Sequence, residues 1–277
     1  DYNSLTGEQM WERIEPKLQN GSIILMHNGT ENTANSLELI ITNIKNKGYN
    51  LVTVSDLIYK ENYGIDNNVV DRIALEMKEA GGDTQIAVVV GGGNIFRGMQ
   101  LSNKTGMVRA TADSMGMLAT IMNAIALKDR FMAAGTPTQI LSSFNIEGMI
   151  EGFERDKAIR ILERGNVLII AGGTSNPYFT TDSTAILRAL EIGASIVLKG
   201  TNVDGVYDKD PKNNEDAKMY NEITFREALN KNLRVMDMTA FAMANDNDMP
   251  IRVFNMNKMG NITKAISGES IGTYVHN

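Results

Sequence analysis

An apolar strand that runs directly into three glycines, IAVVVGGGNIFRG at residues 86–98, constrains the fold of this chain more than any other stretch. Consecutive β-branched residues are typical of a strand covered on both faces, as in a parallel sheet. The glycines let backbone amides approach a ligand without a Cβ in the way, and Arg97 adds a planar guanidinium suited to phosphate oxygens. We interpret the stretch as a phosphate-binding loop; a tight strand-to-helix turn without a ligand is the alternative.

Two known phosphate motifs do not fit this loop. No frame from Gly91 to Gly98 places glycines at the first, third and sixth positions of a dinucleotide-binding fingerprint. Gly93 and Gly98 have the Walker spacing, but Met99 and Gln100 stand where that motif requires Lys and Ser or Thr. The loop therefore indicates a phosphate site of another kind.

Strand and helix patterns alternate from residue 66 onward, which predicts a mostly parallel sheet with helices on both faces. The expected fold class is therefore α/β, a three-layer αβα sandwich. Met115, Met117 and Met122 lie at helical spacing, and we expect them to fill the core. We predict helices at 69–79, 111–134, 155–164, 183–192, 224–230 and 239–247, and strands at 86–90, 138–141, 167–171, 195–200 and 251–254.

Residues 1–62 have a different pattern, a βαβ fragment that is too small to be a stable domain alone. We therefore predict two domains, at 1–62 and 63–277. In the first we expect helices at 8–18, 35–47 and 56–60 and strands at 22–26 and 51–54.

Composition excludes several classes of protein. The net charge of −6 argues against a protein that coats nucleic acid. The absence of cysteine excludes disulfides, and His27 and His276 are too few for a zinc site built on several histidines. Because we find neither an apolar run of about eighteen residues nor a signal-peptide pattern, we expect a cytoplasmic protein that does not contact membranes.

A second glycine-rich loop, AGGTSNPYFTT at 171–181, also follows a buried strand. Its hydroxyls precede Asp182 at the start of a predicted helix, and a helix N-terminus flanked by hydroxyls favours an anion. Tyr178 and Phe179 could shape a pocket for a base or a sugar. Turn chemistry alone explains Gly, Asn and Pro equally well. Two such loops after strands of one sheet, however, meet at the carboxyl edge where these folds bind ligands.

Acidic residues elsewhere have ordinary alternatives. Asp204-Gly205 is a turn signal, and Asp208 and Asp210 have the pattern of solvated loop carboxylates. Asp113, near the start of the long predicted helix, is equally well explained as an acid favoured by the helix dipole.

Residues 63–277 resemble the bacterial uridylate kinases (UMP kinases) of the amino acid kinase family. TSNPYFTTD and TNVDGVYDKDP are specific to these kinases rather than to the fold. The matching runs are VVVGGGNIFRG (88–98), ADSMGMLATIMNAIALKD (112–129), AGGTSNPYFTTDSTAILRALEIGA (171–194), VLKGTNVDGVYDKDP (197–211) and RVMDMTAFAMANDNDMPIRVFNMNK (234–258).

The resemblance implies in-line transfer of a phosphoryl group from Mg-ATP to UMP, a hexameric assembly and regulation by GTP. It implies that Arg97 and Asp182 act at the transferring phosphate, and that Mg²⁺ arrives with ATP rather than in a metal site of the protein. The residues implied to hold UMP are Gly92, Asp113, Thr174, Ser175, Asn176, Pro177, Tyr178, Phe179, Thr180 and Thr181. Those implied to hold ATP are Gly93, Arg97, Thr201, Tyr207 and Asp210.

The chain also departs from these kinases. They open with a strand ending in Lys-Leu-Ser-Gly that binds the transferring phosphates, and no such segment precedes Tyr63 here. We therefore expect either UMP phosphorylation impaired by that loss, or a chimera that binds UMP without turnover. The strand-like run IILMHNGT (23–30) could take the missing position, but Met26 would then replace the lysine, and a thioether cannot neutralise phosphate.

Residues 1–60 resemble the C-terminal end of a polysaccharide deacetylase (NodB-like), through the run at 22–58. In that family Leu25 and His27 line the acetyl pocket. The catalytic aspartate and the metal-binding Asp-His-His set have no counterpart in this chain, so we do not expect deacetylase activity.

Overall fold

The computed structural model describes residues 5–19, 24, 31–49, 64–82, 84–96, 106–233 and 235–277. These residues divide between two compact units, Asp1–Gly64 and Ile65–Asn277. Arg97, Met26 and His27 lie outside the described residues, as do the predicted strand at 51–54 and helix at 56–60.

The first unit pairs two helices, α1 (Gly7–Ile14) and α2 (Glu31–Asn46), with a short 3-10 helix, η1 (Glu15–Lys17), after the first. The α-helix predicted at 8–18 ends at Ile14. Pro16 lacks the amide hydrogen that a continuing α-helix needs. Met10, Ile40 and Ile44 form the buried core of this unit.

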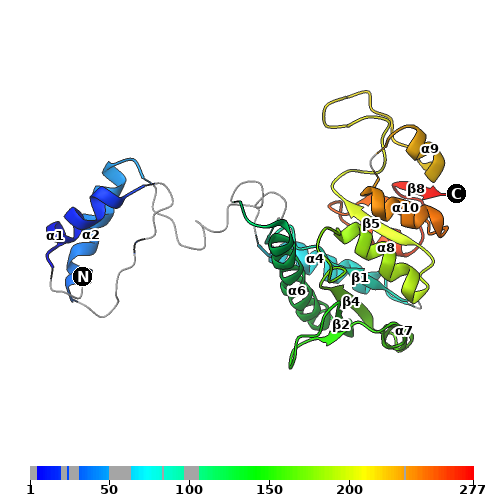
Figure 1. The fold of residues 1–277 in the computed structure, drawn as a ribbon, viewed down its shortest axis with the longest axis horizontal. Coiled ribbons are helices and arrows are strands. Elements are labelled where there is room, and N and C mark those ends of the chain that lie inside the picture. The colour runs from blue at the N-terminus through cyan, green and yellow to red at the C-terminus, as the bar shows by residue number, and fades with distance from the viewer. Residues whose placement is uncertain are drawn as a thin grey trace. The chain divides into compact units, whose positions relative to one another are not determined.

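The second unit contains two four-stranded sheets (Figure 1). In the first, β1 (Ala87–Val89), β4 (Val167–Ala171), β2 (Thr138–Ser142) and β3 (Glu151–Gly152) are parallel and lie in that order. Along β4, alternate side chains pack against opposite layers. Ile169 faces the cluster formed with α4 (Asn67–Glu79) and α6 (Arg109–Ala133), and Leu168 faces α7 (Arg155–Glu163). Burial on both faces is what the continuous apolar run predicts.

The second sheet has the order β5 (Val197–Thr201), β7 (Ile251–Asn255), β8 (Thr273–His276), β6 (Glu222–Thr224), with β7 and β8 antiparallel. The helices α8 (Thr181–Ile192), α9 (Phe225–Asn230) and α10 (Met238–Asp246) pack on one face of it. Leu198 and Phe254, from its other face, join the apolar cluster of β1, β4 and α6. One core therefore continues from the first sheet to the second, and the predicted α/β class with a mostly parallel sheet is confirmed.

A buried carboxylate links elements from opposite ends of this unit. Glu76 of α4 is 3% exposed, and its Oε2 accepts a hydrogen bond from the Ile262 amide at 2.9 Å. That amide belongs to the first turn of α11 (Asn261–Ile266), which has no side-chain cap of its own. Arg72 pairs with the same carboxylate at 2.7 Å, so the buried charge is both neutralised and hydrogen-bonded.

The structure also corrects several expectations. Met115 and Met122 are 39% and 52% exposed, so their assignment to the core is wrong. Ala124 and Phe131 of α6 face the sheet, whereas Met115 and Met122 lie on the other side of the helix and Met117 is half-buried. Among the described helices, α6 alone is long and apolar enough to cross a membrane, and one of its faces packs in this cluster. Four short elements, β3, β6, α11 and β8, were not predicted.

Candidate active site

The loop between β4 and α8 depends on a tight glycine turn. Gly172 and Gly173 have φ angles of +78° and +59°, in the left-handed region that favours glycine. A Cβ on Gly172 would lie 2.6 Å from Ser142 Oγ and 3.0 Å from the Ser143 amide nitrogen. The Gly172 amide donates to Thr120 Oγ1 at 2.8 Å, and Ser143 Oγ donates to the Gly173 carbonyl. The glycines here serve close packing against the end of β2.

The rest of this loop, residues 174–180, exposes two aromatic rings. The Asn176 amide donates to Thr174 Oγ1 at 3.3 Å, which closes a local turn ahead of Pro177. Ser175 and Tyr178 have φ angles of +61° and +73°. Tyr178 is 67% exposed and Phe179 is 49% exposed, so both rings are available to a ligand.

Asp113 ties the long helix to this loop. Its carboxylate oxygens accept hydrogen bonds from Arg109 Nε at 2.9 and 2.8 Å, and Oδ2 also accepts from the Tyr178 amide at 2.9 Å. The Arg109 guanidinium lies 5.6 Å from the centroid of the Tyr178 ring. Because α6 begins at Arg109, Asp113 is beyond the first helical turn, and the helix-dipole explanation does not account for it.

The glycine loop after β1 is fastened to the same helix. Gly92 is buried, and a Cβ on it would lie 2.6 Å from the Gly116 carbonyl oxygen of α6. Asn123 Nδ2 donates to the Gly91 carbonyl at 2.7 Å, and the Asn123 and Asn94 amides pair at 2.6 and 3.0 Å. A Cβ on Gly91 would lie 3.3 Å from the side chain of Thr181. The two glycine-rich loops therefore lie next to each other.

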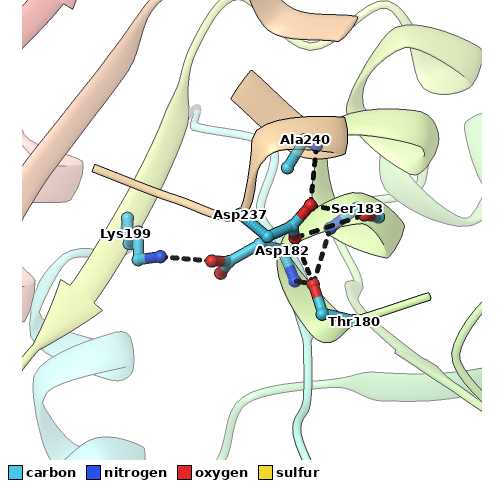
Figure 2. Close-up of polar contacts among 6 residues, drawn as sticks. All are labelled: Thr180, Asp182, Ser183, Lys199, Asp237 and Ala240. Atoms are coloured by element: carbon cyan, nitrogen blue, oxygen red, sulfur yellow. Dashed lines mark hydrogen bonds and ion pairs between the residues drawn. The ribbon is translucent and has the colours of Figure 1, made fainter. Parts of the chain in front are cut away.

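A second aspartate, Asp237, joins the start of α8 to the start of α10 (Figure 2). Thr180 caps α8, because its Oγ1 accepts from the Asp182 and Ser183 amides at 3.1 and 3.3 Å. The same hydroxyl donates to Asp237, whose carboxylate also accepts from Ser183 Oγ at 3.3 Å and from the Ala240 amide at 3.0 Å. Burial alone would raise the pKa of Asp237, but the hydrogen bonds from Thr180, Ala240 and Ser183 outweigh it and hold the pKa below its ordinary value.

We expect Asp237→Asn to lower stability at neutral pH and to lose that effect in acid. A depressed folded pKa contributes stability that is complete above about pH 5 and declines once the pH falls below the unfolded value of about 3.9. Asparagine still caps a helix, so the difference isolates the charge. Urea denaturation of both proteins from pH 7 to pH 3 should show the two midpoints converging. A constant difference across this range would contradict the prediction.

An ion pair lies beside this cluster, at Asp182 and Lys199. Lys199 Nζ of β5 is 2.5 Å from Asp182 Oδ2, and the two side chains are 20% and 29% exposed. Figure 2 shows the amine and the carboxylate pointing toward each other. Asp182 was predicted from the resemblance, and Lys199 was not.

Three of the five residues predicted to hold ATP, Thr201, Tyr207 and Asp210, lie at or beyond the end of β5, whereas Gly93 and Arg97 follow β1. Thr201 Oγ1 donates to the Val203 carbonyl at 2.8 Å and accepts from the Val203 amide at 3.1 Å. These two hydrogen bonds close a turn through the threonine hydroxyl. Tyr207 forms a β-bridge with Met219. Asp210 is exposed and accepts from the Lys212 amide at 2.9 Å, so its contacts in the chain are those of a turn.

Asp204 gathers two polar partners at the ends of β5 and β7. It accepts from Asn255 Nδ2 at 3.0 Å and pairs with Lys258 at 2.8 Å. The hydrogen bond from Lys258, together with that from Asn255, lowers the pKa of Asp204. Among the described residues, no group of three His, Cys, Asp or Glu side chains is arranged to hold a metal ion.

The structure thus brings Gly92, Asp113 and the 174–181 loop together around the N-termini of α6 and α8. Arg109, Asn123, Lys199 and Asp237 were not predicted from the sequence. The sequence contains a recognisable signal for two of these four residues. Asp237 precedes a predicted helix as an N-cap should, and Lys199 shares a strand face with Thr201 because side chains alternate along a strand.

Comparison with known proteins places the chain in a family. The amino acid kinase family matches residues 60–255. The uridylate kinase of Psychromonas ingrahamii is 49% identical over 222 residues, which cover 79% of this chain and 88% of that protein. The uridylate kinase of Xanthomonas oryzae pv. oryzae is 50% identical over 214 residues, covering 77% and 89%.

Solved structures agree with the sequence relatives. The UMP kinase of Bacillus anthracis has a TM-score of 0.75 at 31% identity and covers 78% of this chain and 90% of its own. That of Ureaplasma parvum has a TM-score of 0.73 at 38% identity, covering 77% and 91%. The chain therefore belongs to the amino acid kinase family, and within it to the bacterial uridylate kinases.

Proposed function

We propose that this chain transfers the γ-phosphoryl group of Mg-ATP to UMP, giving UDP and ADP. The observation that carries the proposal is the loop at 172–181, which exposes two aromatic rings and whose capped helix start lies beside the glycine loop after β1. Relatives named uridylate kinase at about half identity support the same reaction.

The described residues supply positioning, which is the main requirement of phosphoryl transfer. Tyr178 and Phe179 offer faces to a pyrimidine base, and the Asp113 carboxylate retains lone pairs for ribose hydroxyls. The Asp182 and Ser183 amides are used by the Thr180 cap, so at the start of α8 the hydroxyl of Thr181 is assigned to the acceptor phosphate. We assign ATP to Gly93, Thr201, Tyr207 and Asp210, with Mg²⁺ entering as part of that substrate, and phosphate contacts to Arg97.

The test is UDP formation by the full chain with UMP, ATP and Mg²⁺, with products separated by chromatography and CMP as the control acceptor. We expect UDP from UMP and far less product from CMP. UMP binding without UDP would instead support the chimera that binds without turnover. Equal rates with UMP and CMP would contradict the proposed acceptor.

We also infer that the chain assembles with copies of itself and responds to GTP. The exposed side of α6 supports assembly, because Met115, Leu118, Met122 and Ile125 form an apolar stripe along it. Light scattering should give a mass well above the 30.4 kDa of one chain, and Leu118→Lys should lower it. A monomer at micromolar concentration would contradict the inference. Cytoplasmic location stays a prediction.

A further inference from the structure

We propose that Lys199 supplies the positive charge that neutralises the phosphoryl group during its transfer, an inference that rests on the proposed kinase function. The lysine was not singled out by sequence. Its position in the fold, its partner and its partial burial carry the argument.

The strand directs Lys199 toward the start of α8. Val197, Lys199 and Thr201 share one face of β5, because side chains alternate along a strand. Val197 packs in the cluster that contains Ile186 of α8, and Leu198 packs in the cluster on the opposite face. Lys199 therefore faces α8, where its amine meets Asp182 at 2.5 Å (Figure 2).

This position lies between the two predicted substrate sites. Asp182 directly follows Thr180 and Thr181, which we assign to UMP. Thr201, the next residue on the same strand face, is assigned to ATP. The Lys199 amine is paired with Asp182, beside the residues assigned to UMP, and Lys199 is two residues from Thr201, which is assigned to ATP. We therefore place the amine where the phosphates of the two nucleotides meet.

The chemistry of the transfer needs such a charge. A phosphate oxygen of UMP forms a bond to the γ-phosphorus, the bond from that phosphorus to the β,γ-bridging oxygen breaks, and its electron pair leaves with ADP. In the transition state, negative charge is spread over the oxygens of the transferring phosphoryl group. An ammonium has three N–H donors, and the Asp182 pair uses one of them. The remaining donors can reach phosphate oxygens in a site that is only 20% exposed at this side chain.

A purely structural ion pair, one that only holds α8 against β5, is the competing explanation. It predicts that losing the charge weakens the fold and both substrate sites together. A charge that acts on the transferring group predicts a lower kcat with UMP binding preserved.

Because the chain contains no cysteine, a cysteine introduced at position 199 is the only thiol that can be alkylated. The amine of Lys199 can therefore be removed by substitution and restored by chemical modification. We expect Lys199→Met and Lys199→Cys to lower kcat by about 100-fold to 1,000-fold, with the KM for UMP within about threefold of the original protein. Treating the Lys199→Cys protein with 2-bromoethylamine converts the cysteine into a lysine analogue. This treatment should raise kcat at least tenfold above that of the untreated variant. Iodoacetamide, which adds a neutral group, should not raise kcat.

Two controls match this design. The original chain treated with 2-bromoethylamine should keep its rate. Lys157→Met removes another partly exposed lysine, 30% exposed and paired with Glu151, from the start of α7, and should leave the rate unchanged. A kcat for Lys199→Met within threefold of the original value, or equal recovery with both reagents, would overturn the proposal.

Equilibrium binding separates this inference from the proposed function. The probe is adenosine and uridine joined by five phosphates, which spans both sites. Lys199→Met should bind it at least tenfold more weakly than the original chain does, and should bind UMP equally well. Unchanged affinity for the probe would overturn the role of Lys199 whether or not the chain turns over. No UDP from the original chain, together with weaker probe binding by the variant, would overturn the kinase reaction and support the placement of the charge.

Discussion

Gly92→Ala will destabilise the second unit by about 3 kcal/mol, because its new methyl group meets atoms that cannot move aside. The Cβ would lie 2.6 Å from the Gly116 carbonyl oxygen, 2.9 Å from Ala119 Cβ and 3.1 Å from the Thr120 amide nitrogen. Two of the three belong to the backbone of α6, which is packed into the core through Ala124 and Phe131. Relieving the contact requires the helix or the loop after β1 to shift.

Gly91→Ala is the matched control. It changes the neighbouring residue in the same loop, where a Cβ would have its nearest contact at 3.3 Å with Thr181 Oγ1, a side-chain atom. We expect this variant to lose less than about 1 kcal/mol. Differential scanning calorimetry should show the transition of Gly92→Ala lowered by roughly 6–12 °C and that of Gly91→Ala by only a few degrees. Similar midpoints for the two variants would show that the loop yields easily and that contact with α6 is not what requires glycine.

This contrast shows what the glycine pattern could and could not predict. The sequence indicated that backbone must approach something closely at residues 91–93. It could not identify the neighbour, because Gly116 and Ala119 are more than twenty residues away along the chain. The structure places helix backbone against Gly92, and leaves Gly91 and Gly93 exposed. Close packing thus accounts for Gly92, and ligand binding by this loop stays a prediction.

Elements with long, uniform patterns were predictable. The strand β4 has its predicted bounds, Val167–Ala171, because five apolar residues stand between turn residues. The helix α8 begins two residues before its predicted start, since Thr180 rather than a later residue provides the cap. β3 and β6 are two and three residues long, too short for any periodicity to register.

Pairings between distant residues were not predictable from one sequence. Asp182 and Lys199 are seventeen positions apart, and Thr180 and Asp237 are fifty-seven apart. Nothing in the local pattern of either residue identifies its partner. The family resemblance provided Asp182 by position, whereas its partner Lys199 became visible only once α8 and β5 were packed together.

The second large effect is expected at Asp113, where Asp113→Ala should raise the KM for UMP by about 10-fold to 100-fold and leave the KM for ATP nearly unchanged. The substitution removes the acceptor for the Tyr178 amide and leaves Arg109 Nε without the carboxylate that accepts from it. Tyr178 has a φ of +73°, a conformation that a tyrosine adopts only when its surroundings hold it there. Without the carboxylate, the loop should relax and the two aromatic rings should lose their fixed positions.

Asp129→Ala is the control for Asp113→Ala, because it removes an aspartate from the other end of the same helix, where the side chain is 79% exposed. Initial rates over a range of UMP concentrations at saturating ATP, and over a range of ATP concentrations at saturating UMP, give the two KM values for each variant. We expect Asp129→Ala to match the original chain. If Asp113→Ala also kept its KM for UMP, the loop would be held by its own turns at Thr174 and Asn176, and the carboxylate would serve only to pair Arg109. A rise in the KM for UMP confined to Asp113→Ala would identify the α6 contact as the element that shapes the acceptor site.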